Sequence, residues 1–163
     1  MQLLIDTCTW IKLDRLRTLK AFSPDQLYLW GEVQITHEVL AEIDHFRVKS
    51  CIREDTTILP IGDRQVYSDA TSAKLDAADA SILSNGTRIH DKIIISEDAG
   101  LLDFARVYRL TAVQLVDFFQ FLTEADYITR RELYRYTRIL RDLKNITKKR
   151  QKEIKSWLIA HQG

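Results

Sequence analysis

Four carboxylic acids fall at the predicted ends of strands or on the helices beside them. Asp6 closes an apolar run at the start of the chain, and Asp98 follows the apolar run Ile93–Ile95. Glu42 and Asp79 lie on predicted helices that flank these runs. Carboxylates brought within roughly 4–6 Å of one another repel unless a cation compensates them. An all-oxygen ligand set suits Mg²⁺ or Mn²⁺ rather than Zn²⁺, so the pattern predicts cation-dependent chemistry such as phosphodiester cleavage.

A sheet is needed to bring these acids together. Short apolar runs alternate with amphipathic segments over residues 1–122, which predicts an α/β fold with a parallel sheet covered on both faces. The predicted strands are 3–5, 33–35, 57–61, 93–95 and 112–115. The predicted helices are 10–16, His37–Phe46 with Thr36 as its N-cap, 64–70, 76–85, 98–107 and 117–122. Ligands bind beyond the carboxyl ends of such strands, so we expect Asp6 and Asp98 to face one crevice.

Each of the four acids also has an interpretation that needs no cation. Asp6 can cap the end of its strand, and Asp98 can be the N-cap of the helix that follows it. Asp79 can be a first-turn acid favoured by the helix dipole, and Glu42 can be a solvated residue of an exposed helix face. These structural interpretations remain open at the level of the sequence.

The motifs around these acids resemble those of PIN-domain nucleases. The resemblance is carried, in order and spacing, by Leu4-Ile5-Asp6-Thr7, Val39-Leu40-Ala41-Glu42-Ile43, Asp76-Ala77-Ala78-Asp79-Ala80 and Ile94-Ile95-Ser96-Glu97-Asp98. It covers residues 1 to about 122. It implies a PIN-like three-layer α/β/α fold with a parallel sheet of about five strands, and an Mg²⁺- or Mn²⁺-dependent endoribonuclease that leaves a 3′-hydroxyl and a 5′-phosphate.

The resemblance also implies roles for single residues. Asp6, Glu42, Asp79 and Asp98 would be the catalytic, metal-binding acids, and Ser96 would be the small hydroxyl residue that supports them. Three further acids lie close in sequence to these four and are compared with them. Asp76 shares a helix face with the third acid and could replace it, Glu38 is a weaker rival one turn before the second, and Glu97 is expected to point away from the fourth.

Many small members of this family are toxins of the virulence-associated protein C type, held inactive by a cognate antitoxin. The resemblance therefore implies a cytoplasmic, homodimeric toxin with RNA as substrate and an antitoxin as partner. Two alternatives remain: an RNA-processing nuclease without an antitoxin, and a catalytically inactive module that binds RNA or protein. The segment 123–163 is longer than the tail of a minimal toxin of this type. This length argues against the toxin assignment but not against the nuclease assignment.

Residues 123–163 are predicted to form a basic helical hairpin appended to the domain 1–122. Residues 129–163 hold 11 Lys or Arg against 3 Asp or Glu, whereas the preceding residues hold 13 against 20. Such a charge asymmetry is typical of a protein that binds a polyanionic partner, or of one whose basic tail folds onto an acidic surface. The residues predicted to contact RNA phosphates are Arg131, Arg135, Arg138, Lys148, Lys149 and Arg150, with Tyr134 or Tyr136 available for stacking. A solvated helix face and a dimer element are the alternatives.

The composition and the absence of certain motifs indicate which other classes of protein the sequence does not resemble. The 163 residues are 45% hydrophobic and 29% charged, with 5 Gly and 2 Pro, which is the usual balance of a globular domain. No charge-free run approaches the roughly eighteen residues of a membrane span. The two cysteines form no CxxC pair, so free thiols in a reducing cytoplasm are the simpler expectation. Neither GxGxxG nor a P-loop occurs, so nothing predicts a nucleotide-binding loop.

Overall fold

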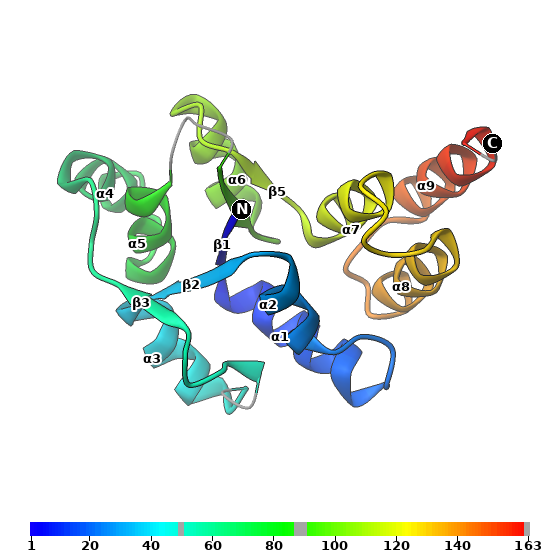
Figure 1. The fold of residues 1–163 in the computed structure, drawn as a ribbon. Coiled ribbons are helices and arrows are strands. Elements are labelled where there is room, and N and C mark those ends of the chain that lie inside the picture. The colour runs from blue at the N-terminus through cyan, green and yellow to red at the C-terminus, as the bar shows by residue number, and fades with distance from the viewer. Residues whose placement is uncertain (49–50, 87–90, 162–163) are drawn as a thin grey trace.

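The structure is a computed structural model that describes residues 1–48, 51–86 and 91–161. The chain alternates strands and helices and ends in a group of helices at one side (Figure 1). The strands are β1 Gln2–Ile5, β2 Glu32–Thr36, β3 Thr57–Leu59, β4 Lys92–Ile95 and β5 Ala112–Val113. The helices are α1 Thr7–Thr18, the 3₁₀ turn η1 Pro24–Gln26, α2 Leu27–Trp30, α3 His37–Phe46, α4 Arg64–Ser72, α5 Ala77–Asn85, α6 Ala99–Val107, α7 Leu115–Glu124, α8 Arg130–Asp142 and α9 Lys148–Ala160.

The five strands form one parallel sheet in the order β3-β2-β1-β4-β5. The chain steps from β1 outward to β2 and β3, and then returns past β1 to add β4 and β5 on the other side. The strand order therefore reverses between β1 and β4, which pair along their whole length. In an open parallel sheet the ligand crevice lies at such a reversal, outside the carboxyl ends of the strands.

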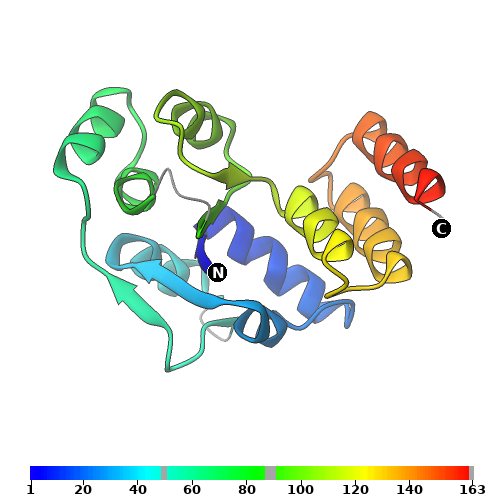
Figure 2. The same ribbon diagram turned by 45° about the horizontal axis from the view of Figure 1, so that its top comes forward.

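Helices cover both faces of the sheet, and the reason is the handedness of parallel crossovers. The connections through α1 and α3 step in one direction across the sheet, and those through α5 and α6 step in the other, so right-handed crossovers place the two pairs on opposite faces. Helix α1 contacts α3, α5 contacts α6, and α3 and α5 also contact each other. Figure 2 shows helices on either side of the strands. The predicted three-layer α/β/α arrangement with five parallel strands is compatible with this structure.

The central strands are apolar because both of their faces are covered. Leu3, Leu4, Ile5, Ile94 and Ile95 have at most 1% of their surface exposed. Complete burial of a side chain of this size contributes about 1.5–3 kcal/mol. The free energy that holds β1 beside β4 is therefore large, and it fixes the positions of the residues that follow both strands.

The helical group α7, α8 and α9 packs on the sheet domain through aromatic residues. Phe22, just after α1, lies 5.3 Å from Phe119 of α7 and 5.6 Å from Tyr136 of α8, measured between ring centroids. Helical periodicity predicts an apolar face on each helix of the hairpin, and most of its residues are buried within the chain: Leu133, Tyr136, Leu140, Ile154 and Leu158. Leu143 and Trp157, predicted to lie on the same faces, are partly buried. The apolar faces of the hairpin therefore need no second copy of the chain to cover them. The boundary predicted at 122/123 falls inside α7.

Most predicted elements are confirmed within one to three residues, and the caps explain why. Thr36 caps α3 by accepting from the N–H of Val39, and Thr129 forms a capping box with Glu132 at the start of α8. Helical periodicity predicts that Phe46 faces the core together with Val39, Leu40 and Ile43. This is wrong for Phe46, which lies in the last turn of α3, is 53% exposed and packs edge-on against His45. None of the helices in the described ranges has the length and apolarity needed to cross a membrane.

Candidate active site

The carboxyl ends of β1 and β4 bring Asp6 and Ser96 together across 90 residues of sequence. The Ser96 hydroxyl donates to Oδ2 of Asp6 at 2.5 Å, and both residues are buried, with 2% and 0% of their surface exposed. The N–H of Asp98 donates in turn to the Ser96 hydroxyl at 3.0 Å. Ser96 therefore links the first and the fourth predicted acid, as expected for a residue that supports a site.

Asp6 is also the N-cap of α1, because its Oδ1 accepts from the N–H of Thr9 at 2.6 Å. Burial raises the pKa of the Asp6 carboxyl, while the hydrogen bonds from Ser96 and Thr9 lower it. Asp98 is likewise the N-cap of α6, through the N–H of Leu101 at 2.8 Å. The N-cap interpretation is thus correct for Asp98, whereas Asp6 caps the helix that follows its strand rather than the end of the strand. Both oxygens of Asp6 accept hydrogen bonds, Oδ1 from Thr9 and Oδ2 from Ser96.

Glu42 is held at the end of β1 by Thr7, a residue to which the sequence analysis gave no role. Thr7, which directly follows Asp6, donates its hydroxyl to Oε2 of Glu42 at 2.5 Å. Glu42 thereby lies next to the end of β1, although it belongs to α3. Its rival Glu38 has a buried Oε2 without a hydrogen-bond partner among the described residues. The Asp-Thr pair at a strand end was the available signal for Thr7.

Helix α5 carries the third acid to the cluster. The Thr36 hydroxyl, at the end of β2, lies 2.6 Å from the hydroxyl of Ser81, which ties α5 to the carboxyl edge of the sheet. Asp76 is the N-cap of this helix and accepts from the N–H of Asp79 at 2.9 Å. Asp79 is partly buried in the first turn, whereas Asp76 is exposed. Asp76 is therefore the cap, and Asp79 is the acid turned toward the protein.

The pKa of Asp79 responds to the other acids. Burial and negative neighbours together raise the pKa of this carboxyl from 3.8 to about 7. The neighbours, in decreasing order of effect, are Asp76, Asp98, Asp6 and Glu42. The Cys8 thiol responds to the same acids. Its pKa is raised to about 11, first by partial burial and then by four negative charges, those of Asp6, Asp79, Asp98 and Glu42. The four predicted acids therefore surround one region, next to Cys8.

Glu97 points away from this region, as predicted. Its Oε1 accepts from the N–H of Leu115, the first residue of α7, at 2.8 Å. Burial raises the pKa of the Glu97 carboxyl, while the Leu115 N–H and the facing side chain of Asn145 lower it. Its backbone N–H lies 3.4 Å from Oδ2 of Asp6. Glu97 thus joins the loop after β4 to the helical group.

The donor set fits a hard divalent cation in its chemistry. All four side chains offer carboxylate oxygens, and burial and the charges of the neighbouring acids raise the pKa of Asp79. Within residues 1–48, 51–86 and 91–161, however, no three His, Cys, Asp or Glu side chains are arranged closely enough to hold one ion. Three of the four carboxylates, those of Asp6, Glu42 and Asp98, accept hydrogen bonds from the chain itself.

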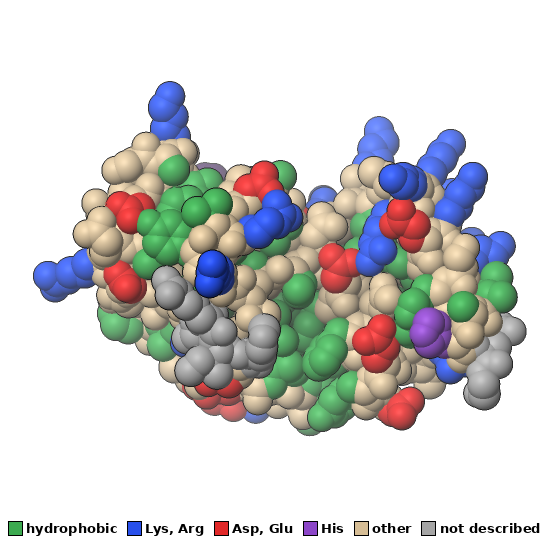
Figure 3. Space-filling model, turned by 90° about the horizontal axis from the view of Figure 1, so that it is seen from above, with side chains coloured by type: hydrophobic (Ala, Val, Ile, Leu, Met, Phe, Trp, Pro, Cys, Tyr) green, Lys and Arg blue, Asp and Glu red, His purple; other side chains and the backbone are tan. Residues whose placement is uncertain are grey.

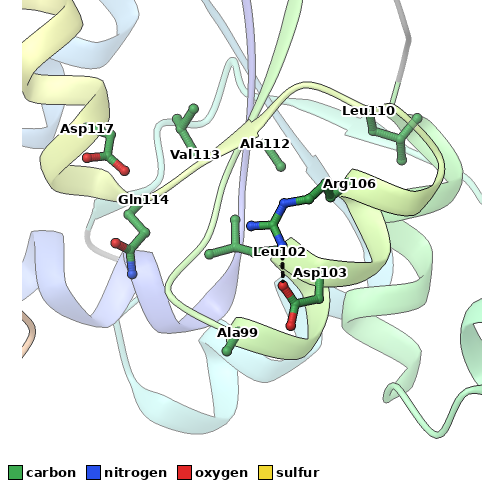
Figure 4. Close-up of a pocket in the computed structure, with 9 residues that line it drawn as sticks. All are labelled: Ala99, Leu102, Asp103, Arg106, Leu110, Ala112, Val113, Gln114 and Asp117. Atoms are coloured by element: carbon green, nitrogen blue, oxygen red, sulfur yellow. Dashed lines mark hydrogen bonds and ion pairs between the residues drawn. The ribbon is translucent and has the colours of Figure 1, made fainter.

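A separate pocket of about 450 Å³ lies at the outer edge of the sheet, beside β5 (Figure 4). Arg106 and Asp103 of α6 form an ion pair at 2.7 Å on its wall. Asp117 and Gln114 line its other side, near the start of α7. None of the four predicted acids lines this pocket, so it is not the candidate active site.

The basic residues of the hairpin are divided between two helices. Several Lys and Arg side chains project over the helical group in Figure 3, on the right of the view. Arg131 and Arg138 are exposed on α8, and Lys148 and Lys149 are exposed on α9. Arg150 differs from them, because its guanidinium binds Asp117, Gln120 and Glu153 and is two-thirds buried. Arg150 therefore joins α9 to α7, and these contacts explain its presence without any contact to RNA.

The chain matches no protein-family model, no curated protein and no solved structure. What it does is therefore argued from its own residues.

Proposed function

We propose that this chain is a divalent-cation-dependent endoribonuclease whose active site is the cluster Asp6, Glu42, Asp79 and Asp98. The observation that carries the proposal is that hydrogen bonds hold Asp6, the backbone of Asp98 and Glu42 at the carboxyl ends of β1 and β4, where the strand order reverses. Acids grouped in this way, with Asp6 buried and the other three partly buried, repel one another and lower stability, so their grouping supports a role in function.

Mg²⁺ or Mn²⁺, when bound, supplies Lewis acidity and activates water for phosphodiester hydrolysis. The residues of the chain hold the acids that would receive it. Ser96 and the N–H of Thr9 fix Asp6 in one orientation, and Thr7 does the same for Glu42. With a pKa of about 7, the Asp79 carboxyl is about half protonated at neutral pH, and a bound cation would favour its ionised form. Hydrogen-bonded carboxylates of this kind are typical of sites in which a second set of residues orients the ligands.

RNA as the substrate is supported by the charge distribution. The acid cluster repels phosphates in the absence of a cation, so a polyanionic substrate needs a separate positive surface on which to bind. The exposed basic residues of α8 and α9 supply such a surface, and they belong to the segment in which basic residues outnumber acidic ones by 11 to 3.

The test uses purified wild-type protein and its Asp6→Asn and Asp79→Asn variants. We expect the wild type to cleave a mixed-sequence RNA with Mn²⁺, to be silenced by EDTA, and to lose at least a hundredfold in rate in either variant. Asp63→Asn is the matched control, because Asp63 is an exposed N-cap of α4 outside the cluster. Cleavage that persists in Asp79→Asn, or the absence of cleavage by the wild type, contradicts the proposal.

The toxin assignment is supported by the motif resemblance alone. Growth arrest on induction of the wild type, but not of Asp6→Asn, supports a toxin and its antitoxin partner. Cleavage in the test tube without growth arrest favours an RNA-processing nuclease. Salt-dependent RNA binding without cleavage by the wild type favours an inactive binding module. Sedimentation of the wild type tests the predicted homodimer.

A further inference from the structure

Helix α8 carries a groove of about 400 Å³ that is separate from the acid cluster. The groove is lined by Arg131, Tyr134, Arg135, Arg138, Ile139 and Asp142. The three arginines lie three to four residues apart, so they follow one side of the helix. The helical group therefore carries a concave, basic surface.

The positive charge of the groove is not compensated by the protein. Arg131 and Arg138 are exposed, and neither has a hydrogen-bond or ion-pair partner in the part of the chain that the structure describes. Asp142, the one acid in the lining, is paired with Arg141. Arg135 is fixed by donating to the carbonyl of Lys20 at 2.9 Å. Two unpaired guanidinium groups therefore flank a third that is held in place.

An aromatic ring lies between these cations in the sequence. Tyr134 is 42% exposed and lines the groove, and it stacks on no other ring and forms no hydrogen bond among the described residues. Its neighbour Tyr136 is 2% exposed and packs on Phe22 and Phe119, so it is not available to a ligand. The structure thus selects Tyr134 from the two tyrosines that the sequence left as alternatives.

We infer that the α8 groove binds single-stranded RNA, with Arg131 and Arg138 on phosphates and Tyr134 stacked on a base. The inference rests on the proposed function in taking RNA as the ligand. The guanidinium fork matches phosphate oxygens, and seven residues of helix separate the two arginines by about 10.5 Å, a span that exceeds a single phosphate. A base can meet an aromatic ring only when it is not stacked within a duplex, which makes the ligand single-stranded.

Helix α9 lacks this combination. Its exposed lysines are compact charges, its Arg150 is bound to Asp117, and its Trp157 is already stacked on His161 at 4.6 Å between ring centroids. Lysines without a free ring attract phosphates in general but do not hold a base. The α9 face therefore adds to the attraction, and the α8 groove forms the binding site.

The experiment measures the affinity of the full chain for a fluorescein-labelled twelve-nucleotide RNA in EDTA, where no cleavage interferes. The same RNA annealed to its complement is the duplex probe. The variants are Arg131→Ala with Arg138→Ala, and Tyr134→Ala alone. The matched control is Lys152→Ala with Lys155→Ala, which removes the same charge from exposed positions of α9.

We expect the double arginine variant to bind the single strand at least tenfold more weakly and to show a shallower salt dependence, whereas the lysine control changes affinity less than threefold. Tyr134→Ala should weaken single-strand binding by about 5- to 100-fold, the effect of one lost base stack, and leave duplex binding unchanged. Equal losses in the arginine and lysine variants, or normal single-strand binding by Tyr134→Ala, overturn the inference.

The two proposals fail separately. If the protein binds RNA through α8 but does not cleave it with Mn²⁺, the nuclease proposal is wrong and the groove stands. If the protein cleaves RNA but the α8 variants bind normally, the groove is wrong and the nuclease stands. Thermal unfolding of every variant verifies that it is folded, and the exposure of all the substituted side chains makes a loss of stability unexpected.

Discussion

Replacing Asp79 by Asn should stabilise the protein that lacks a cation and abolish its activity. The physical reason is the charge that Asp79 carries into a crowded region of the molecule. Burial and four neighbouring acids raise the pKa of its carboxyl from 3.8 to about 7. Between these two pH values the folded protein binds more protons than the unfolded chain, so the free energy of unfolding falls as pH rises.

The size of the effect follows from the pKa. A rise from 3.8 to about 7 corresponds to about 4 kcal/mol lost by the folded state once both states are ionised. The favourable interaction of an acid with the N-terminus of α5 offsets about 0.3–1 kcal/mol of the gain from removing this charge. Asp79→Asn should therefore exceed the wild type by about 3 kcal/mol at pH 8 and by only about 1 kcal/mol at pH 5.

Urea unfolding in EDTA at pH 5 and pH 8, followed by tryptophan fluorescence, measures this difference, because Trp10 is buried in the core. Asp63→Asn is the control and should change stability by less than 0.5 kcal/mol, since Asn is an equally good N-cap. Added Mn²⁺ should stabilise the wild type more than the Asp79→Asn variant. An Asp79→Asn protein that is less stable than the wild type at pH 8 in EDTA refutes the reasoning.

Three further predictions follow from single contacts. Ser96→Ala removes the hydroxyl that donates to buried Asp6, so it should lower the free energy of unfolding by about 1–3 kcal/mol, measured in urea. Cys8, whose pKa is about 11, should react with iodoacetamide at pH 7.5 more slowly than a free cysteine in solution, and equal rates, measured in a Cys51→Ser background, disprove the local negative field. Arg150→Ala should lose about 1 kcal/mol of stability in urea yet change RNA affinity no more than the lysine control does, and a larger loss of affinity argues for a direct RNA contact.

Local sequence features predicted most of the secondary structure. The run Ile93–Ile95 forms most of β4, and Thr36 and Thr129 cap the helices that they were expected to cap. These features depend on residues a few positions apart, so the chain specifies them before it is folded. The N-cap interpretation of Asp98 was correct for the same reason.

Side-chain exposure within a helix was less predictable. Periodicity marked Phe46 as a core residue, but it lies in the last turn of α3, where its ring is more than half exposed. Sequence also left Tyr134 and Tyr136 as equal candidates for stacking. The packing of Tyr136 against Phe22, more than a hundred residues earlier in the chain, decided between them.

By itself, then, the sequence determined the acids, their order along the chain and the elements that carry them. Only the tertiary structure decided that they face one another. Parallel strands are joined by crossovers, and the order in which the strands pair is not set by any local pattern. Burial of β1 against β4 places Ser96 in contact with Asp6, and Thr7 then holds Glu42 beside it, so carboxylates that are far apart in the chain share one negative field.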